Sequence, residues 1–131
     1  MTAPQLEEAV CALPLGVRAV GVARRFIEQT LPTWGADREQ LDTATLIASE
    51  LVTNAVLYGY GAATLELRAT GDRVRILVSD GAAAPPQARA AAADAEIGRG
   101  LRVVEACCLA WGVEPAQDGK VVWCELGLTA G

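Results

Sequence analysis

The chain has 131 residues, of which 52% are hydrophobic, with a formal net charge of −5 and no histidine. This length suits one domain, and an acidic balance without a broad basic patch argues against DNA or RNA as the main partner. The absence of histidine excludes Ser-His-Asp and Cys-His catalysis and a phospho-accepting histidine. It also argues against a zinc site, since the four cysteines form no C-x-x-C pair.

The chain carries no pattern of a membrane or secreted protein. No apolar run reaches the roughly 18 residues that a membrane span requires. Residues 1–13 contain Glu7 and Glu8 and lack the basic start of a signal peptide. We therefore expect a cytoplasmic protein without membrane contact, built as a single domain over residues 1–131, with residues 1–13 as a flexible or loosely packed N-terminus.

The first half of the chain predicts two helices. Residues 1–16 are expected to be irregular, because prolines and a glycine interrupt them. Residues 17–31 have an apolar stripe at helical spacing, and Pro32 ends that helix. Asp37 is a plausible N-cap for a longer helix over residues 38–58, which Gly59 would close.

The second half changes to strand periodicity. Residues 64–69 and 74–78 alternate around a turn and predict a hairpin. Residues 82–97 are rich in alanine and are expected to form a mobile loop that closes on a ligand. A third helix is expected over residues 101–110, followed by a short strand from Val113 and a last strand over 121–128. This order predicts an α+β fold, a two-layer α/β sandwich with a mixed, mostly antiparallel sheet and helices on one face.

Three local patterns could carry chemistry. Glu50 and Asn54 lie four residues apart and share one helix face, where a carboxylate and an amide oxygen suit a hydrated Mg²⁺. Asp80 ends a buried strand before Gly81 and can accept a hydrogen bond from an exocyclic amine such as that of adenine. Each pattern has a plain structural reading as well: a solvated side-chain pair for the first, and a strand-ending turn for the second.

The third pattern is Gly98-Arg99-Gly100-Leu101 at the start of the third helix. Its glycines allow the backbone to approach a ligand closely, and the free N–H groups of a helix start suit phosphate. A G-x-G sequence also occurs at ordinary junctions between a loop and a helix.

Together these patterns resemble the GHKL ATPase superfamily, which has the Bergerat (histidine-kinase-like ATPase) fold. The resemblance runs from about residue 13 to 128 and rests on SELVTNA at 49–55, SDG at 79–81, GRGL at 98–101 and GKVVW at 119–123. It is closest to small stand-alone actinobacterial members that resemble anti-sigma-factor serine/threonine kinases.

The resemblance implies a role for each residue. Glu50 would act as the catalytic base or orient the attacking group, Asn54 would coordinate the Mg²⁺ that bridges the ATP phosphates, and Asp80 would bind the adenine amine. The implied nucleotide-binding set is Asn54, Asp80, Gly81, Gly98, Arg99, Gly100 and Leu101. The implied cofactors are ATP and Mg²⁺, and the implied partners are a sigma factor and an anti-anti-sigma (STAS-like) protein. The resembled kinases act as dimers, so a homodimer is a further expectation.

The chain departs from the superfamily pattern in three places. The stretch after Asn54 lacks the basic or histidine residue that members often have, Gly81 is followed by alanines and prolines instead of further glycines, and a threonine often found on the last strand is replaced within 121–123. A catalytically weak or inactive nucleotide-binding or protein-interaction module is therefore the alternative to a kinase. The ATP-binding half of a split histidine kinase is disfavoured, because the chain lacks helices that present a histidine.

Overall fold

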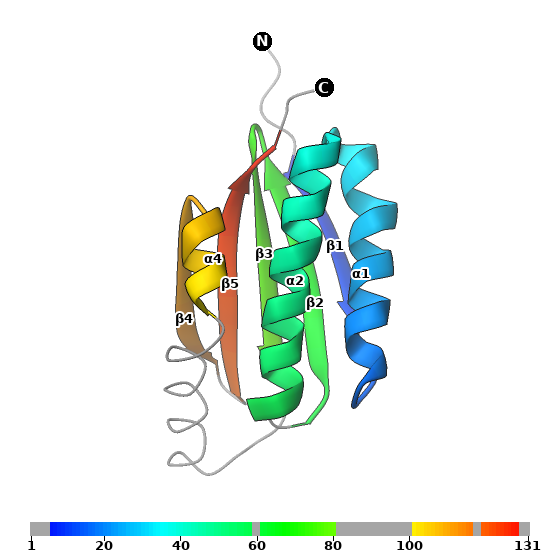
Figure 1. Cartoon of the computed structure of the whole chain (residues 1–131), viewed down its shortest axis with the longest axis vertical. Coiled ribbons are helices and arrows are strands. Elements are labelled where there is room, and N and C mark those ends of the chain that lie inside the picture. Colours follow the sequence, from blue (N-terminus) through cyan, green and yellow to red (C-terminus); the bar gives the residue numbers. More distant parts are fainter. Residues whose placement is uncertain (1–5, 59–60, 81–100, 117–118, 129–131) are drawn as a thin grey trace.

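Helices and strands segregate into two layers in this protein (Figure 1). The computed structural model describes residues 6–58, 61–80, 101–116 and 119–128. In chain order, the described elements are β1 (Leu6–Ala12), α1 (Arg18–Thr30), the 3₁₀ helix η1 (Leu31–Trp34), α2 (Arg38–Tyr58), β2 (Ala63–Thr70), β3 (Arg73–Asp80), α4 (Leu101–Cys107), β4 (Ala110–Ala116) and β5 (Gly119–Gly127).

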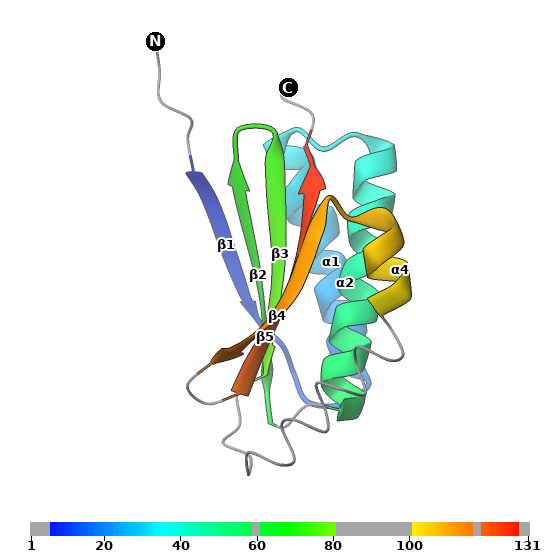
Figure 2. The same cartoon turned by 90° about the vertical axis from the view of Figure 1, so that its left-hand side faces the viewer.

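The strands form one five-stranded sheet in the order β1-β2-β3-β5-β4. Every strand pair that the structure describes is antiparallel. Seen from the side, α1, α2 and α4 all lie on one face of this sheet (Figure 2). The α+β two-layer sandwich predicted from the sequence is confirmed.

The hydrophobic core lies between the two layers. Alternate residues of β2 and β3 point into it, and Leu65, Leu67 and Ile76 are fully buried. From the helix layer, Ile27 of α1 and Ile47 of α2 meet them at full burial. Because a strand has a period of two and a helix of 3.6, each element contributes only one face to this core.

The N-terminus of α2 has the cap that the sequence predicts. The main-chain N–H of Gln40 donates to Asp37 Oδ1 at 2.8 Å, and the main-chain N–H of Asp37 donates to Gln40 Oε1 at 3.0 Å. This reciprocal pair satisfies two N–H groups near the helix start. It fixes where α2 begins and therefore the register of every later residue on the helix, Glu50 and Asn54 included.

The prediction that residues 1–16 are irregular is wrong for Leu6–Ala12, which forms β1 at the edge of the sheet. Its main chain pairs with β2 along its whole length, from Leu6 opposite Thr70 to Ala12 opposite Thr64. Most side chains of β1 are exposed, and Val10 is 62% exposed. An edge strand held by main-chain hydrogen bonds needs no buried alternation, so periodicity did not reveal it.

The third helix is shorter than predicted. It ends at Cys107, and Ala110, which the sequence placed in the helix, is the first residue of β4. The main-chain N–H of Leu109 already donates to the carbonyl of Glu125 at 2.8 Å, so pairing with β5 replaces helical hydrogen bonding at that point. None of the helices in the described part of the chain has the length and hydrophobicity needed to cross a membrane.

Candidate functional site

Glu50 and Asn54 lie one turn apart in the second half of α2. The helix is anchored on the core by Ile47, Leu51 and Val52, which are at most 2% exposed. Glu50 is partly buried, whereas Asn54 is buried with 5% of its surface exposed. The predicted pair is therefore held on a rigid helix at the border between core and solvent.

The amide of Asn54 is incompletely satisfied. Its Nδ2 atom is buried and has no hydrogen-bond partner within the described ranges. A buried polar group without a partner costs about 1–3 kcal/mol, and such groups are rare in folded proteins. A phosphate oxygen would give this nitrogen an acceptor, and the amide oxygen is a ligand type that Mg²⁺ takes. Asn54 thus fits the nucleotide and metal that the sequence pattern implies.

Asp80 is the last residue of β3 and is joined to Lys120 at the start of β5. The ammonium of Lys120 donates to Asp80 Oδ2 at 2.8 Å, and the main-chain N–H of Lys120 donates to Asp80 Oδ1 at 2.9 Å. The side chain of Asp80 is only 5% exposed and that of Lys120 only 8%. The residue predicted to bind the adenine amine is therefore engaged by a buried cation.

Gly119 makes room for this pair. A β-carbon at this position would lie 2.7 Å from the main-chain oxygen of Asp80 and would overlap its carboxylate. Only a glycine therefore lets β5 begin against Asp80 in the observed geometry. Neither Gly119 nor Lys120 was among the predicted site residues. Two signals were available: both residues stand in the GKVVW stretch on which the resemblance rests, and Lys120 is the single lysine of the chain.

The topology brings these features to one end of the molecule. Figure 1 shows that α2 ends on the side where β3 ends and β5 begins, whereas α4 begins about halfway along α2 and runs away from that end. Of the other predicted residues, Gly81, Gly98, Arg99 and Gly100 lie outside the described residues. Leu101 is the first residue of α4.

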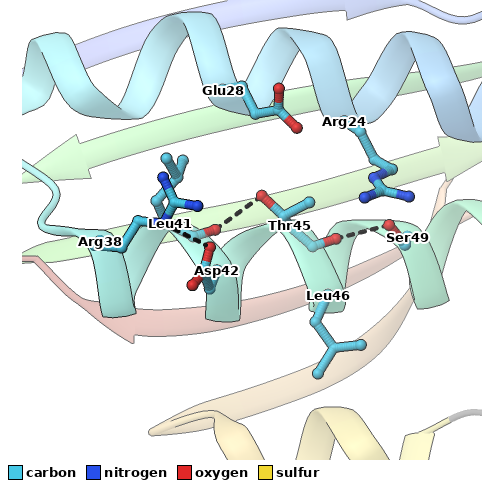
Figure 3. A pocket seen from close by; sticks show the side chains of 8 residues that line it. All are labelled: Arg24, Glu28, Arg38, Leu41, Asp42, Thr45, Leu46 and Ser49. Carbon is cyan, nitrogen blue, oxygen red and sulfur yellow. Dashed lines mark hydrogen bonds and ion pairs between the residues drawn. The ribbon is translucent and has the colours of Figure 1, made fainter.

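A separate groove of about 600 Å³ runs between α1 and α2 (Figure 3). Arg24 and Glu28 line it from α1, and Arg38 and Asp42 line it from α2. The ion pair of Arg38 with Asp42 spans 3.5 Å and is exposed, so it contributes little stability. The hydroxyl of Ser49 donates to the carbonyl of Thr45 within α2. Of the predicted site residues that the structure describes, none lines this groove, and its mixed charges favour no single ligand charge.

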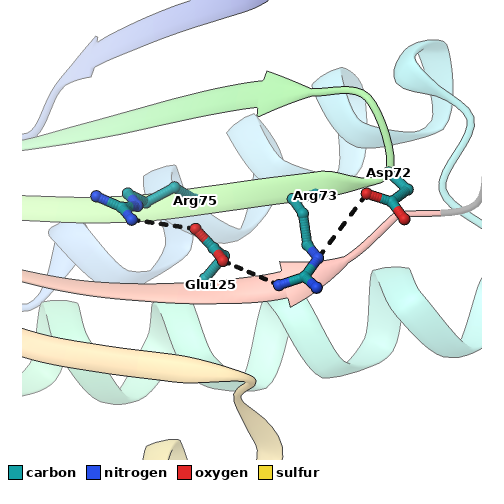
Figure 4. Close-up of polar contacts among 4 residues, drawn as sticks. All are labelled: Asp72, Arg73, Arg75 and Glu125. Atoms are coloured by element: carbon teal, nitrogen blue, oxygen red, sulfur yellow. Dashed lines mark hydrogen bonds and ion pairs between the residues drawn. The ribbon is translucent and has the colours of Figure 1, made fainter.

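The sheet face opposite the helices carries a second polar cluster (Figure 4). Glu125 on β5 accepts from Arg73 and Arg75 of β3 at 3.1 Å each. The guanidinium of Arg75 lies 4.2 Å from the ring centre of Trp123, a cation–π contact. These groups satisfy one another across two neighbouring strands, and the plain reading of this cluster is stabilisation of the β3–β5 pair.

Comparison with known proteins agrees with this geometry. The family model of the histidine kinase-like ATPase domain matches residues 13–125. The matched range includes Glu50, Asn54, Asp80 and Lys120. No curated protein matches the chain significantly.

Proposed function

This chain belongs to the histidine kinase-like ATPase domain family, and on that premise we propose that it is an anti-sigma factor with serine/threonine kinase activity on an anti-anti-sigma partner. The family membership makes it an ATP-binding regulatory protein of the GHKL type. The kinase activity, the sigma factor and the STAS-like acceptor are the parts that the proposal adds.

The observation that carries the proposal is the state of Asn54. A buried amide whose Nδ2 has no partner within the described part of the chain is a costly feature unless a ligand completes it. In the proposed complex, the amide oxygen of Asn54 would hold Mg²⁺ and its nitrogen would donate to a phosphate oxygen. Glu50, one turn earlier on α2, lies beside that position.

Each remaining site residue has a proposed task. Asp80 accepts from the adenine amine. Gly98, Arg99 and Gly100 lie outside the described residues; by the family resemblance they would bind the phosphates together with Leu101 at the start of α4. A bound Mg²⁺ would neutralise charge that develops on the transferred phosphoryl group, and positioning by the residues of the chain would supply most of the remaining catalysis.

The proposed reaction moves the γ-phosphoryl group of ATP to a serine or threonine hydroxyl of the acceptor. The bond between the β,γ-bridging oxygen and the γ-phosphorus breaks, a bond forms between that phosphorus and the hydroxyl oxygen, and Glu50 takes the hydroxyl proton as ADP departs. The new phosphate adds negative charge to the acceptor. This charge weakens the contact between the acceptor and the acidic chain, which leaves the chain available to a sigma factor.

The test uses the full chain, Mg-ATP and candidate STAS-like acceptors encoded beside it. We expect one phosphoserine or phosphothreonine on the acceptor by mass spectrometry. Glu50→Ala should abolish transfer while ATP binding, measured by calorimetry, persists. Glu39→Ala, which changes an exposed carboxylate in the first turn of the same helix, is the matched control and should transfer at the wild-type rate. Transfer by Glu50→Ala at the wild-type rate would rule out this mechanism.

A specific observation favours the second candidate, a nucleotide-binding module with weak or no turnover. Asp80 is already paired with Lys120, so the base-binding carboxylate is not open to a ligand. Binding of ATP without phosphorylation of any acceptor, together with capture of a sigma factor, would support this candidate over the kinase. Light scattering of the same samples tests the proposed homodimer, which requires a mass of two chains.

A further inference from the structure

The ion pair between Asp80 and Lys120 closes the position at which the proposed function places the nucleobase. Both oxygens of Asp80 are engaged, Oδ2 by the ammonium and Oδ1 by the main-chain N–H of Lys120. With only 5% of the Asp80 side chain exposed, a ligand cannot reach the carboxylate while the ammonium stays in place.

The pairing follows from the sheet register. β3 and β5 are antiparallel neighbours, and Ser79 lies opposite Val121. The next positions towards the end of the sheet are Asp80 and Lys120, so the two side chains meet where the strands leave the core. Gly119 provides the space for the carboxylate. The contact is thus built into the strand pairing and does not arise from a chance rotamer of a surface lysine.

The choice of residue is itself informative. Among 11 basic residues in the chain, Lys120 is the one lysine and the other ten are arginines. A compact ammonium fits beside a buried carboxylate where a planar guanidinium, which binds carboxylates in a bidentate way, needs more room.

We propose that Lys120 is the affinity-determining residue of the nucleotide site and holds Asp80 closed until an incoming base displaces its ammonium. This inference rests on the proposed function, because it concerns the same site. To bind adenine, Asp80 must exchange a positively charged donor, the ammonium of Lys120, for a neutral one, the adenine amine. Because the hydrogen bond between two opposite charges is the stronger of the two, breaking the ion pair opposes ATP binding. Lys120 therefore weakens ATP binding in the wild-type chain and keeps the site empty at low nucleotide concentration.

The first test is the sign of an affinity change. Lys120→Met removes the ammonium at similar side-chain length, and we expect it to bind Mg-ATP at least about tenfold more tightly than the wild type in calorimetry. If Lys120 instead contacted phosphate, or only supported the fold, Lys120→Met would bind Mg-ATP more weakly than the wild type. Arg68→Met removes one positive charge from an exposed position on β2 and controls for net charge. It should leave the affinity unchanged.

The second test uses the wild-type chain, so it holds even if Lys120→Met folds poorly. Because the chain has one lysine, acylation of its single ε-amine by an N-hydroxysuccinimide ester can be followed by mass spectrometry. We expect slow acylation of the free protein, since the side chain is 8% exposed, and faster acylation once Mg-ATP displaces the ammonium.

The outcomes separate this inference from the proposed function. Tighter binding of Mg-ATP by Lys120→Met than by the wild type, together with faster acylation of the wild type under Mg-ATP, supports this role of Lys120, even if no acceptor is phosphorylated. Two results would overturn this role of Lys120 and leave the proposed function standing, provided that the wild type binds ATP. One is equal or weaker ATP binding by Lys120→Met, and the other is acylation of the wild type that Mg-ATP slows or leaves unchanged. Absence of ATP binding by both proteins overturns both.

Discussion

Gly119 lies against Asp80 with no space between them for a side chain. A β-carbon on residue 119 would sit 2.7 Å from the main-chain oxygen of Asp80, and the nearby carboxylate would have to move. The two residues lie on neighbouring strands, so this close approach sets where the carboxylate points. The position of a proposed ligand-binding group is thus determined by a residue without any functional group.

Gly119→Ala should therefore damage both the fold and the site. We expect a loss of about 1–3 kcal/mol in the free energy of unfolding, because the added methyl group must either push β3 and β5 apart or displace the carboxylate of Asp80. ATP affinity should fall as well, since Asp80 is displaced. Gly127→Ala, at the other end of β5, meets nothing within 4 Å and should change the unfolding free energy by no more than about 0.5 kcal/mol. Equal stabilities of the two variants in urea denaturation would contradict the close packing.

Asp80→Asn should weaken nucleotide binding and also destabilise the free protein. The substitution removes the counter-charge of Lys120, an ammonium that is 8% exposed, and loss of one partner of a buried pair costs up to about 3–5 kcal/mol. Combining it with Lys120→Met should restore much of the stability without restoring ATP affinity. Asp72→Asn, at a carboxylate that is 80% exposed, is the control and should be neutral. Calorimetry and thermal unfolding of the four proteins measure both effects, and unchanged ATP affinity in Asp80→Asn would remove Asp80 from the site.

Asn54→Leu should stabilise the ligand-free protein and at the same time abolish its ATP binding. The change replaces a buried amide with an unpartnered nitrogen by an apolar side chain of similar size, so the free energy of unfolding without ligand should rise by about 1 kcal/mol. Mg²⁺-dependent ATP binding should be lost, because the oxygen ligand is gone. Measurements of both quantities on one preparation are decisive. A strongly destabilised variant would mean that the amide is satisfied in the free protein.

The helix layer was predictable because its signals are local. The polar side chain of Asp37 stands directly before an amphipathic stretch, and the observed α2 spans the predicted residues 38–58. The apolar periodicity around Glu50 and Asn54 likewise placed both on one helix at the correct spacing. Such signals depend on neighbours within a few residues, which the sequence displays directly.

The strand β1 and the partner of Asp80 were not predictable in the same way. β1 is held by main-chain pairing with a strand more than fifty residues later in the chain, and its side chains are mostly exposed. Lys120 lies 40 residues after Asp80, and only the order of β3 and β5 in the sheet brings them together. Contacts that depend on the order of strands in the sheet leave no local pattern in the sequence. The sequence therefore could not reveal that Asp80, the predicted acceptor for the adenine amine, is already paired with Lys120.

The thiols of Cys108 and Cys124 give the last prediction. Cys108 follows the end of α4 and Cys124 is buried on β5, and a hydrogen bond between their side chains lowers the pKa of the Cys108 thiol. The same contact, with burial, raises the pKa of the Cys124 thiol. Cys108 should therefore become a thiolate at lower pH than an ordinary cysteine. It should react with iodoacetamide at about pH 8 before most of an unperturbed thiol has ionised.

Cys124→Ala removes the hydrogen bond to Cys108, so the pH profile of Cys108 alkylation should shift upward and its rate near pH 8 should fall. Peptide mass spectrometry follows each cysteine separately, and the exposed neighbour Cys107 serves as the internal control, with an unchanged rate. Circular dichroism confirms that the variant is folded before rates are compared. A Cys108 profile that is the same in both proteins would show that Cys124 does not stabilise the thiolate, and the two sulfur atoms would then be independent in solution.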